Sequence, residues 1–296
     1  MIHNALKFFI SGLKMVYFLL GMLIKENFVN YIKKAGTNDI CTSKRLILLG
    51  NGPSLMDVIK NWRHNDIFRD ADVLAVNYFC HDDSFVEIKP KYYILSDPQF
   101  FDDGSLLIDK VNKMYEYLNG NVTWQMFLYV QYYAWRKIDW KEKIHNANIK
   151  VIPFHSLKYS GYDSLRNLFF KHGIGSGNYG TVILNGEFIG LNLGYKKLYL
   201  YGVDHNFFDS ICINSDNQLC NIVTHFYDSS PILKPMTHHW YSGKETVFRI
   251  SEYLQDKAGL FHGHEILQEF ADYCGANIYN CTKNSLIDAY ERYNDT

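Results

Sequence analysis

The sequence lacks the features that mark several common protein classes. Thirty Lys and Arg against 31 Asp and Glu leave a net charge of −1, so it has no excess of basic side chains of the kind that a general nucleic-acid-binding protein uses on phosphates. Six scattered cysteines without a Cys-x-x-Cys pair exclude a dense disulfide framework and disfavour structural zinc. These absences predict a folded protein with reduced thiols, as in the cytoplasm, and no nucleic-acid partner.

What the chain does contain is a regular alternation of apolar segments. Its 296 residues are enough for a full hydrophobic core, and 47% of them are hydrophobic. Short β-rich runs occur at residues 45–49, 72–76, 92–95, 122–130, 149–154, 197–201 and 276–279, and helical periodicity occurs at 55–62, 181–193, 245–258 and 265–273. Strands alternating with helices predict an α/β protein with a Rossmann-like, mostly parallel sheet and helices on both faces.

The N-terminal segment is the longest apolar stretch. Residues 5–24 are apolar apart from Lys7, Ser11 and Lys14, and basic residues follow them. Because Lys14 would be costly at bilayer depth, an amphipathic helix on the membrane surface fits better than a spanning helix, with packing on the protein's own core or on a second copy of the chain as the alternatives. Residues 35–43 resemble a linker, so we expect an N-terminal segment at 1–43 and an α/β domain at 44–296.

Polar residues follow four of the predicted strands. They are Gly50, Asn51, Gly52, Pro53 and Ser54 after the first, Asn77 after the second, Ser96 and Asp97 after the third, and Gly202, Val203, Asp204 and His205 after 197–201. In parallel sheets ligands bind outside the carboxyl ends of the strands, so these side chains are candidates for one site.

Two glycine-rich turns precede helices. Gly50 and Gly52 let the backbone approach a ligand at a helix start, where an anion is favoured, although a simple tight turn would look the same. Gly175, Ser176 and Gly177 precede the second helix, and together the two turns predict a nucleotide held from two sides. Neither turn has the spacing of a dinucleotide-binding or ATPase loop.

Histidines supply the candidate base. Adjacent His238 and His239 follow a stretch without periodicity, so residues 205–240 are expected to form a lid-like insertion over the site. An imidazole suits deprotonation of a sugar hydroxyl near neutral pH. Asp204 beside His205 could instead hold a ribose, an acceptor hydroxyl or a metal, but the irregular spacing of the acidic and histidine residues does not predict a metal site.

Taken in order, these segments resemble the bacterial lipooligosaccharide sialyltransferases. The similarity runs over residues 44–290 and includes the segments at 50–55, 76–79, 96–98, 176–177, 200–204, 238–239 and 284–286. It extends to a superfamily with the motility-associated-factor flagellin glycosyltransferases and the 6-hydroxymethylpterin pyrophosphokinases. Where the sialyltransferases place two tyrosines on the departing phosphate, this chain has Asn206 and no tyrosine before Tyr227.

The resemblance implies a single Rossmann-like domain with a lid that uses a CMP-activated sugar without a metal ion. It implies that Asn51, Asn77, Ser176, Gly177 and Asp204 hold the nucleotide. It also implies that His239 is the general base of an inverting transfer, with His238 as the competing assignment.

The expected function is therefore sugar transfer in bacterial surface-polysaccharide, O-antigen or lipooligosaccharide synthesis. The donor would be a CMP-linked sialic acid, nonulosonic acid or Kdo, and the acceptor a glycan or lipid-linked oligosaccharide. The protein would lie on the inner face of the cytoplasmic membrane. The alternative is a metal-dependent phosphoryl or pyrophosphoryl transferase like the pterin enzymes, with Asp204, His205 and His239 near a magnesium ion.

Overall fold

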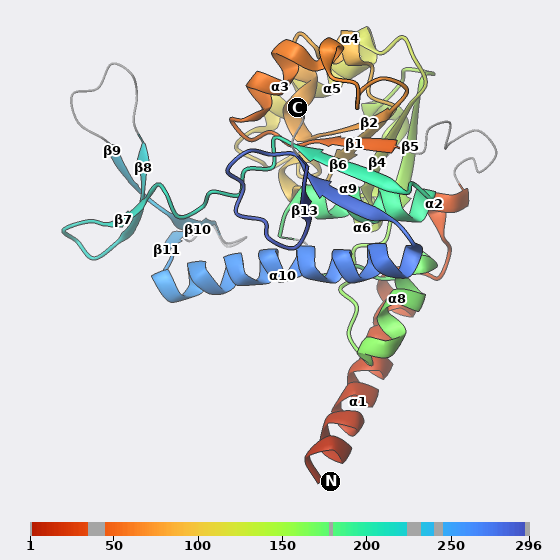
Figure 1. Cartoon of the computed structure of the whole chain (residues 1–296), viewed down its shortest axis with the longest axis vertical. Helices are drawn as coiled ribbons and strands as arrows, with labels where there is room; N and C mark the ends of the chain where they lie inside the picture. Colours follow the sequence, from red (N-terminus) through yellow and green to blue (C-terminus); the bar gives the residue numbers. More distant parts are fainter. Residues whose placement is uncertain (1, 35–44, 178–179, 224–231, 240–244, 294–296) are drawn as a thin grey trace.

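The computed structural model describes residues 2–34, 45–177, 180–223, 232–239 and 245–293 (Figure 1). Its centre is an eight-stranded sheet with the order β13-β12-β6-β1-β2-β3-β4-β5, in which all neighbouring strands are parallel. The strands are β1 (Arg45–Leu49), β2 (Asp72–Val76), β3 (Tyr92–Leu95), β4 (Met126–Gln131), β5 (Ile149–Phe154), β6 (Lys197–Tyr201), β12 (Asn277–Asn280) and β13 (Glu291–Arg292). The predicted α/β class and parallel sheet are confirmed.

The order of the strands fixes where a ligand can bind. From β1 the chain proceeds strand by strand to β5, and it then returns to place β6 on the other side of β1. The connections therefore leave β1 and β6 in opposite directions and open a crevice beyond their carboxyl ends. This is the position at which open α/β sheets bind ligands.

Alternating side chains build one core on each face of the sheet. In β1, Leu46 and Leu48 face one core and Ile47 and Leu49 face the other. The first core is covered by α1 (Ile2–Lys25), α2 (Tyr31–Lys34), α8 (Asp163–Lys171), α9 (Val182–Leu193) and α10 (Ile250–Cys274). The second is covered by α3 (Leu55–Asn61), α4 (Phe85–Ile88), α5 (Ile108–Asn121), α6 (Tyr132–Lys137) and α7 (Trp140–Lys143), with single 3₁₀ turns at Trp62–His64, Asn77–His81 and Pro98–Phe100. The predicted helices on both faces are confirmed.

Helix α9 is buried along almost its whole length and lies directly on the sheet. A Cβ atom at Gly190 would come within 2.6 Å of the Leu46 side chain, and one at Gly186 within 3.0 Å of Leu48. These two glycines, four residues apart on one face, therefore let the helix axis approach the sheet closely. The close packing aims the N-terminus of α9 at the crevice beyond β1 and β6.

The segment between β6 and α10 differs from its prediction in two ways. The stretch without periodicity, expected to form a lid-like insertion at 205–240, contains β7 (Ile211–Ile213), β8 (Leu219–Val223) and β9 (Ile232–Pro235), which form an antiparallel sheet beside the main body (Figure 1). The expected helix at 245–258 is instead the strand β11 (Glu245–Val247), paired with β10 (Thr237–His239), followed by the first turns of α10. Helix α10 then continues through 265–273, because nothing between Ala258 and Glu265 breaks it. The prediction of two separate helices was wrong.

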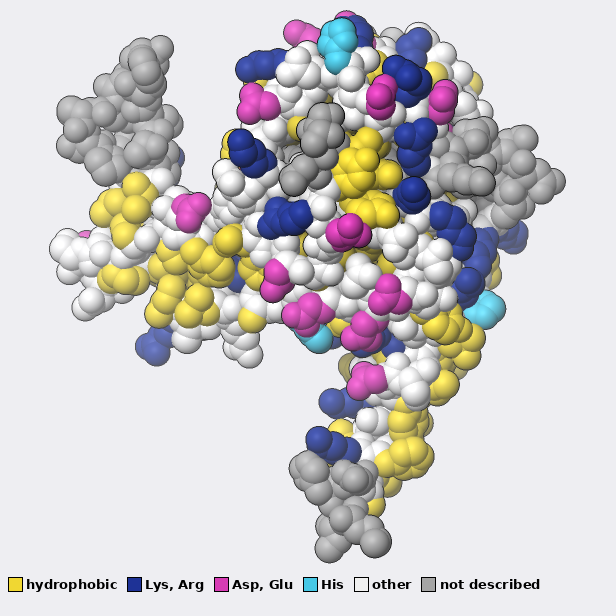
Figure 2. All heavy atoms as spheres, viewed as in Figure 1, with side chains coloured by type: hydrophobic (Ala, Val, Ile, Leu, Met, Phe, Trp, Pro, Cys, Tyr) yellow, Lys and Arg dark blue, Asp and Glu magenta, His cyan; other side chains and the backbone are white. Residues whose placement is uncertain are grey.

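Helix α1 has two unlike halves. Its C-terminal half packs against the first core through Met15, Phe18 and Met22, all less than a tenth exposed. Its N-terminal half extends away from the body, and apolar side chains lie along it (Figures 1 and 2). Of the described helices, α1 is the one whose length and composition would suffice to cross a membrane. The predicted linker at 35–43 lies outside the described residues.

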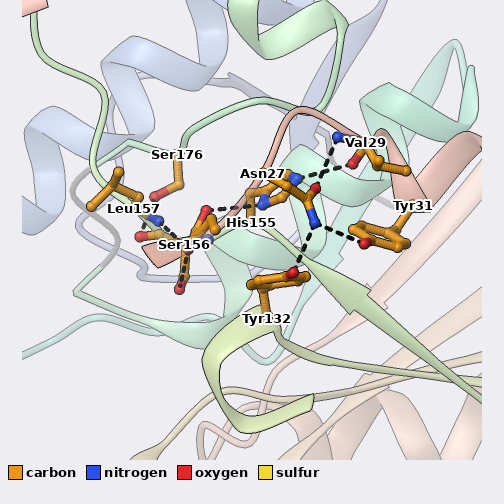
Figure 3. Close-up of polar contacts among 9 residues, drawn as sticks. Asn27, Val29, Tyr31, Tyr132, His155, Ser156, Leu157 and Ser176 are labelled. Carbon is orange, nitrogen blue, oxygen red and sulfur yellow. Dashed lines mark hydrogen bonds and ion pairs between the residues drawn. The ribbon is translucent and has the colours of Figure 1, made fainter. Parts of the chain in front are cut away.

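A buried ion pair joins the end of α1 to the sheet (Figure 3). The Glu26 carboxylate accepts hydrogen bonds from His155 Nδ1 at 2.9 Å and from the backbone N–H groups of Ser156 and Leu157 at 3.1 and 3.0 Å. The second ring nitrogen of His155 faces the Val29 carbonyl at 2.9 Å. The N-terminal segment is therefore attached to the α/β body by specific polar contacts as well as by apolar packing.

Candidate functional site

A cavity of about 410 Å³ lies in the crevice beyond β1, β2 and β6. Its walls come from Gly50–Pro53 after β1, Val76 and Asn77 at the end of β2, Gly202–Phe207 after β6, and Thr181–Ile183 at the start of α9. The volume falls in the usual range for small-molecule sites. Three of the four predicted strand ends thus meet in one place, which we call the first cavity.

The glycines of the first turn allow two strand ends to touch. The Gly50 and Gly52 N–H groups donate to the carbonyls of Tyr201 and Gly202, both at 2.8 Å. A Cβ at Gly50 would lie 2.3 Å from the Gly202 oxygen, and one at Gly52 would lie 1.9 Å from Asp204 Oδ2. No other residue fits at either position without moving the backbone after β6. The glycines are therefore needed to bring the Asp204 side chain to the cavity.

Asp204 is held from both sides. Its Oδ2 atom accepts a hydrogen bond from the Ser54 hydroxyl at 2.9 Å, and its backbone carbonyl accepts one from the Leu286 N–H at 3.2 Å. The contact to Ser54 uses one carboxylate oxygen. Asp204 therefore presents a negatively charged acceptor in a fixed position on the cavity wall.

Two asparagines supply amide groups near β2. Asn51 Nδ2 donates to the Val76 carbonyl at 3.1 Å, so this side chain bridges the ends of β1 and β2. Asn77 has a positive φ of 52°, and its Nδ2 donates to Asp97 at 3.3 Å. Its Oδ1 is buried and accepts no hydrogen bond from any described residue. Burial raises the pKa of Asp97, which stands behind Asn77 and is not on the cavity wall.

His205 lies on the opposite wall, in a left-handed conformation with φ of 51°. Its ring stacks on Phe207 with centroids 5.1 Å apart and lies 5.2 Å from the ring of His264 on α10. Burial, followed by the charges of His264 and Lys257, lowers the pKa of His205 to about 3. The imidazole is therefore neutral at physiological pH.

The second glycine turn is not part of the first cavity. Ser176 and Gly177 line a separate cavity of about 580 Å³ at the base of α1, together with Lys14, Lys158 and Arg166. Ser176 donates to the Ser156 carbonyl at 2.9 Å, and both serines are labelled in Figure 3. A Cβ at Gly175 would meet the Phe18 ring of α1 at 2.8 Å.

The prediction that Gly175, Ser176 and Gly177 line the same site as Asn51 is therefore not confirmed. Packing against α1 holds these residues at the separate cavity, away from the first cavity. The start of α9, four residues further on at Thr181, is the part that reaches the first cavity.

The candidate bases lie in the β10–β11 hairpin. His238 lies against Phe248, and its Nε2 is 3.8 Å from Glu252 on α10. His238 is not on the wall of the first cavity. The backbone of His239 pairs with Glu245, and its side chain lies outside what the structure describes. The choice between the two histidines stays a prediction.

Comparisons with known proteins come from structure alone, since no protein-family model and no curated protein matches the sequence. Two similar solved structures are sialyltransferases. One is sialyltransferase CstII from Campylobacter jejuni in complex with the substrate analogue CMP-3FNeuAc, at 16% identity and a TM-score of 0.41, covering 85% of this chain and 86% of that chain. Another is a CST-II variant in complex with CMP, at 15% identity and a TM-score of 0.42, covering 85% and 87%.

Sequence reasoning missed a buried polar cluster next to the site. Glu187 on α9 accepts a hydrogen bond from Tyr290, and both residues contact His264. The signal was present in the sequence, because Glu187 is the only charged residue between 182 and 193. A lone carboxylate in an otherwise uncharged helix indicates a buried partner.

Proposed function

We propose that this chain is a glycosyltransferase that takes a sugar from a CMP-activated donor and transfers it to a hydroxyl of a glycan acceptor. The observation that carries the proposal is the meeting of three segments at the first cavity. The segments at 50–53, 76–77 and 202–204 are separate in the sequence, and each belongs to the resemblance to the lipooligosaccharide sialyltransferases. The fold supplies an independent reason, since the cavity lies at the switch point of the sheet.

The first cavity suits a nucleotide. Asn51 and Asn77 supply amides that can pair with a base, and Asp204 supplies an acceptor for hydroxyl groups. The N-terminus of α9 favours the phosphate, because its first N–H groups have no partners within the helix. We propose the nucleoside monophosphate part of the donor as the occupant.

In the proposed reaction the acceptor hydroxyl loses its proton to an imidazole, for which we propose His239, with His238 as the competing assignment. The acceptor oxygen then attacks the anomeric carbon while the bond from that carbon to the phosphate oxygen breaks, so CMP departs with the bonding electrons. Attack opposite the leaving group inverts the anomeric centre. The proposed donor sugar is a sialic acid, a related nonulosonic acid or Kdo.

Replacement of the base tests the mechanism. A general base contributes about 10²- to 10⁴-fold to rate, so His239→Ala is expected to lower transfer by that factor while CMP binding is retained. His238→Ala is the matched control, and the reverse result would assign His238. Full transfer by both variants would refute a base in this hairpin.

The nucleotide is tested by thermal shift with CMP, CDP, UDP, GDP and ATP, each with and without magnesium. A ligand that binds only the native state, present at 100 times its Kd, adds about 2.7 kcal/mol to stability. Stabilisation by CMP or CDP alone is the expected result. Magnesium-dependent stabilisation by ATP alone would contradict the proposal and support phosphoryl transfer. Within the described ranges, no three His, Cys, Asp or Glu side chains gather to hold a metal ion.

We also propose that α1 attaches the enzyme to the membrane surface, where lipid-linked acceptors lie. Phe9, Leu13, Tyr17, Leu20 and Ile24 form a stripe at helical spacing, and each is at least half exposed. Burial of such a stripe in lipid would stabilise membrane binding by about 25 cal/mol per Å² of apolar surface removed from water. With the apolar stripe in the acyl region and Lys14 among the headgroups, α1 would lie at the membrane surface.

Vesicle binding tests the attachment. Leu13→Ser combined with Leu20→Ser is expected to weaken binding to anionic phospholipid vesicles by roughly 100-fold, because each leucine loses about 1.5 kcal/mol of burial in lipid. Leu106→Ser is the matched control, since Leu106 is 96% exposed and lies outside α1. Unchanged vesicle binding, with a dimer that dissociates in the double variant, would assign the stripe to a second copy of the chain.

A further inference from the structure

The cavity of about 580 Å³ at the base of α1, which we call the second cavity, has no part in the proposed reaction. Basic side chains line it from three parts of the chain. Lys14 comes from α1, Lys158 from the segment after β5, and Arg166 from α8. Because its volume is in the range of small-molecule sites, we looked for a ligand that these side chains could bind.

Short contacts hold two of its walls together. The Ser160 hydroxyl donates to the Lys14 carbonyl at 3.2 Å. A Cβ at Gly161 would lie 2.7 Å from the Met15 side chain, so the segment after β5 lies directly against α1. The backbones that carry Lys14 and Lys158 are therefore fixed relative to each other.

The basic groups of the second cavity have donors to spare. Within the described ranges, the ammonium groups of Lys14 and Lys158 form no hydrogen bond or ion pair. Arg166 pairs with Glu269 through Nη2, and its side chain is only 12% exposed. Its Nε is buried and has no hydrogen-bond partner in the described part of the chain. A buried guanidinium N–H of this kind requires an acceptor.

The acidic groups nearby do not cancel this charge. Asp163 is the one carboxylate on the described wall, and Glu269, the partner of Arg166, is 63% exposed. His262 also lines the cavity, but it contacts Glu265, and water screens this pair because both side chains are more than half exposed. The wall therefore keeps a net positive charge and favours an anion.

Phosphate fits these groups better than a carboxylate does. A phosphate monoester carries about 1.5 to 2 negative charges near pH 7, and it has three oxygens that accept hydrogen bonds. A guanidinium group and two ammonium groups on three different elements can therefore bind separate oxygens of one phosphate or diphosphate.

The position of the second cavity points to a lipid as the source of that phosphate. Lys14 is bordered on α1 by Ile10 and Tyr17, one helical turn before and after it, which are 41% and 74% exposed. Lys7 lies two turns before Lys14 on the same side of the helix. Figure 2 shows basic side chains on one side of α1 and apolar ones on the other. The basic wall is therefore next to the apolar stripe that we propose lies in lipid.

We propose that the second cavity binds the phosphate or diphosphate head of a membrane lipid, whose hydrocarbon chain lies beside the apolar stripe of α1. Gly177 lines the second cavity and Thr181 lines the first, so their Cα atoms are at most about 14 Å apart. A glycan attached to the lipid phosphate can therefore extend to the first cavity. The role of this lipid as acceptor rests on the proposed function, and its phosphate contacts rest on the second cavity.

Vesicle binding by the full-length protein tests the phosphate contacts. Addition of a long-chain polyprenyl diphosphate to phosphatidylcholine vesicles is expected to tighten binding roughly 10- to 100-fold, the usual effect of hydrogen bonds to a charged group. Lys158→Gln combined with Arg166→Gln should remove this gain. Lys113→Gln combined with Lys141→Gln is the matched control, because both lysines are exposed on helices over the other face of the sheet.

The gain separates a specific site from general attraction to anionic lipid. A gain that survives in the Lys158 and Arg166 variant, or that falls equally in the control variant, would overturn the proposal. Lys158→Glu keeps the test decisive if loss of the contact between Arg166 and Glu269 unfolds the protein. Lys158 is exposed, so this variant should fold and should also lose the gain.

Two further probes identify the source of the phosphate. A similar gain with phosphatidylglycerol in the vesicles, lost in the Lys158 and Arg166 variant, would support the lipid site with an ordinary phospholipid as its ligand. Inorganic pyrophosphate is measured by calorimetry. If it binds in solution as tightly as the lipid does in vesicles, and the same variant loses it, the ligand is a free phosphate compound and the lipid proposal is wrong.

Thermal shift with CMP reads the proposed function separately. If wild-type protein binds the diphosphate lipid through Lys158 and Arg166 but does not bind CMP, the lipid site is supported and the proposed donor is wrong. If wild-type protein binds CMP, and binds vesicles through the apolar stripe of α1, but shows no gain with diphosphate lipid, the lipid site is refuted and the proposed function stands.

Discussion

Removing the Glu26 carboxylate should weaken the attachment of α1 to the body at a large and calculable cost. Both ring nitrogens of His155 face oxygen atoms, Glu26 on one side and the Val29 carbonyl on the other, so we expect the ring to donate from both nitrogens opposite the carboxylate. The His155 side chain is 1% exposed. Breaking a buried ion pair by removing one partner costs about 3–5 kcal/mol, because the other charge stays buried. Glu26→Ala should therefore lower the free energy of unfolding by that amount.

A conservative variant separates charge from shape. In Glu26→Gln the amide oxygen can still accept from the backbone N–H groups of Ser156 and Leu157, and the amide N–H can donate to a neutral His155. We therefore expect a cost of only about 1 kcal/mol. Glu116→Ala, at an exposed position of α5, should stay within about 0.5 kcal/mol of wild type.

Urea unfolding at pH 7, followed by tryptophan fluorescence and circular dichroism, measures these differences. Hydrogen exchange over residues 22–33 locates them, since faster exchange is expected there in Glu26→Ala. A cost below about 1 kcal/mol for Glu26→Ala, or equal costs for the alanine and glutamine variants, would refute the charged pair as the attachment of α1.

Three further predictions concern the core and the site. Gly52→Ala should abolish CMP binding measured by calorimetry, because its Cβ would meet Asp204 Oδ2 at 1.9 Å, whereas Gly120→Ala, with nothing within 4 Å of the new Cβ, should leave binding unchanged. Gly190→Ala should lower the unfolding free energy by about 1–3 kcal/mol in urea, through the clash with Leu46 at 2.6 Å; an unchanged midpoint would contradict the close approach of α9. The pKa of His205 is lowered to about 3 in the native protein, whereas an unfolded histidine binds a proton near pH 6.5. Below about pH 6.5 the unfolded chain therefore binds a proton that the native chain does not bind. The free energy of unfolding should fall as the pH drops from about 6.5 toward 3, by at most about 1.4 kcal/mol per pH unit. Urea titrations of wild type and His205→Phe at pH 7 and pH 5 isolate that proton, and identical pH dependence would show that His205 titrates normally.

The sequence by itself determined the class of the fold and one side of the site. Runs such as residues 45–49 and 197–201 lack the alternation of apolar and polar residues that a strand with one solvent-exposed face shows. They therefore predict strands of a parallel sheet that are buried on both faces. The glycines after β1 and the Asp204 turn after β6 were readable as a site, because the carboxyl ends of parallel strands share one edge. These inferences depend on local periodicity and on a rule that holds for every sheet of this kind.

The tertiary structure decided which turns share a cavity and which buried charges have partners. The turn with Ser176 looks like a second nucleotide loop, yet packing of Phe18 from α1 against Gly175 holds it at another cavity. The described parts of the segment between β6 and α10, 211–223 and 232–235, have little periodicity because they form a small sheet whose strands are only three to five residues long. Local patterns carry no information on contacts of this kind.

The buried cluster of Glu187, Tyr290 and His264 and the Glu26–His155 pair join residues that are far apart along the chain. Glu187 and Tyr290 are 103 residues apart, and Glu26 and His155 are 129 apart. A single sequence shows that Glu187 and Glu26 are carboxylates near apolar residues, but not which imidazole lies against each of them. That choice follows from the packing of α9, α10 and α1 on the sheet, because only a folded core removes water and brings the partners of each carboxylate together.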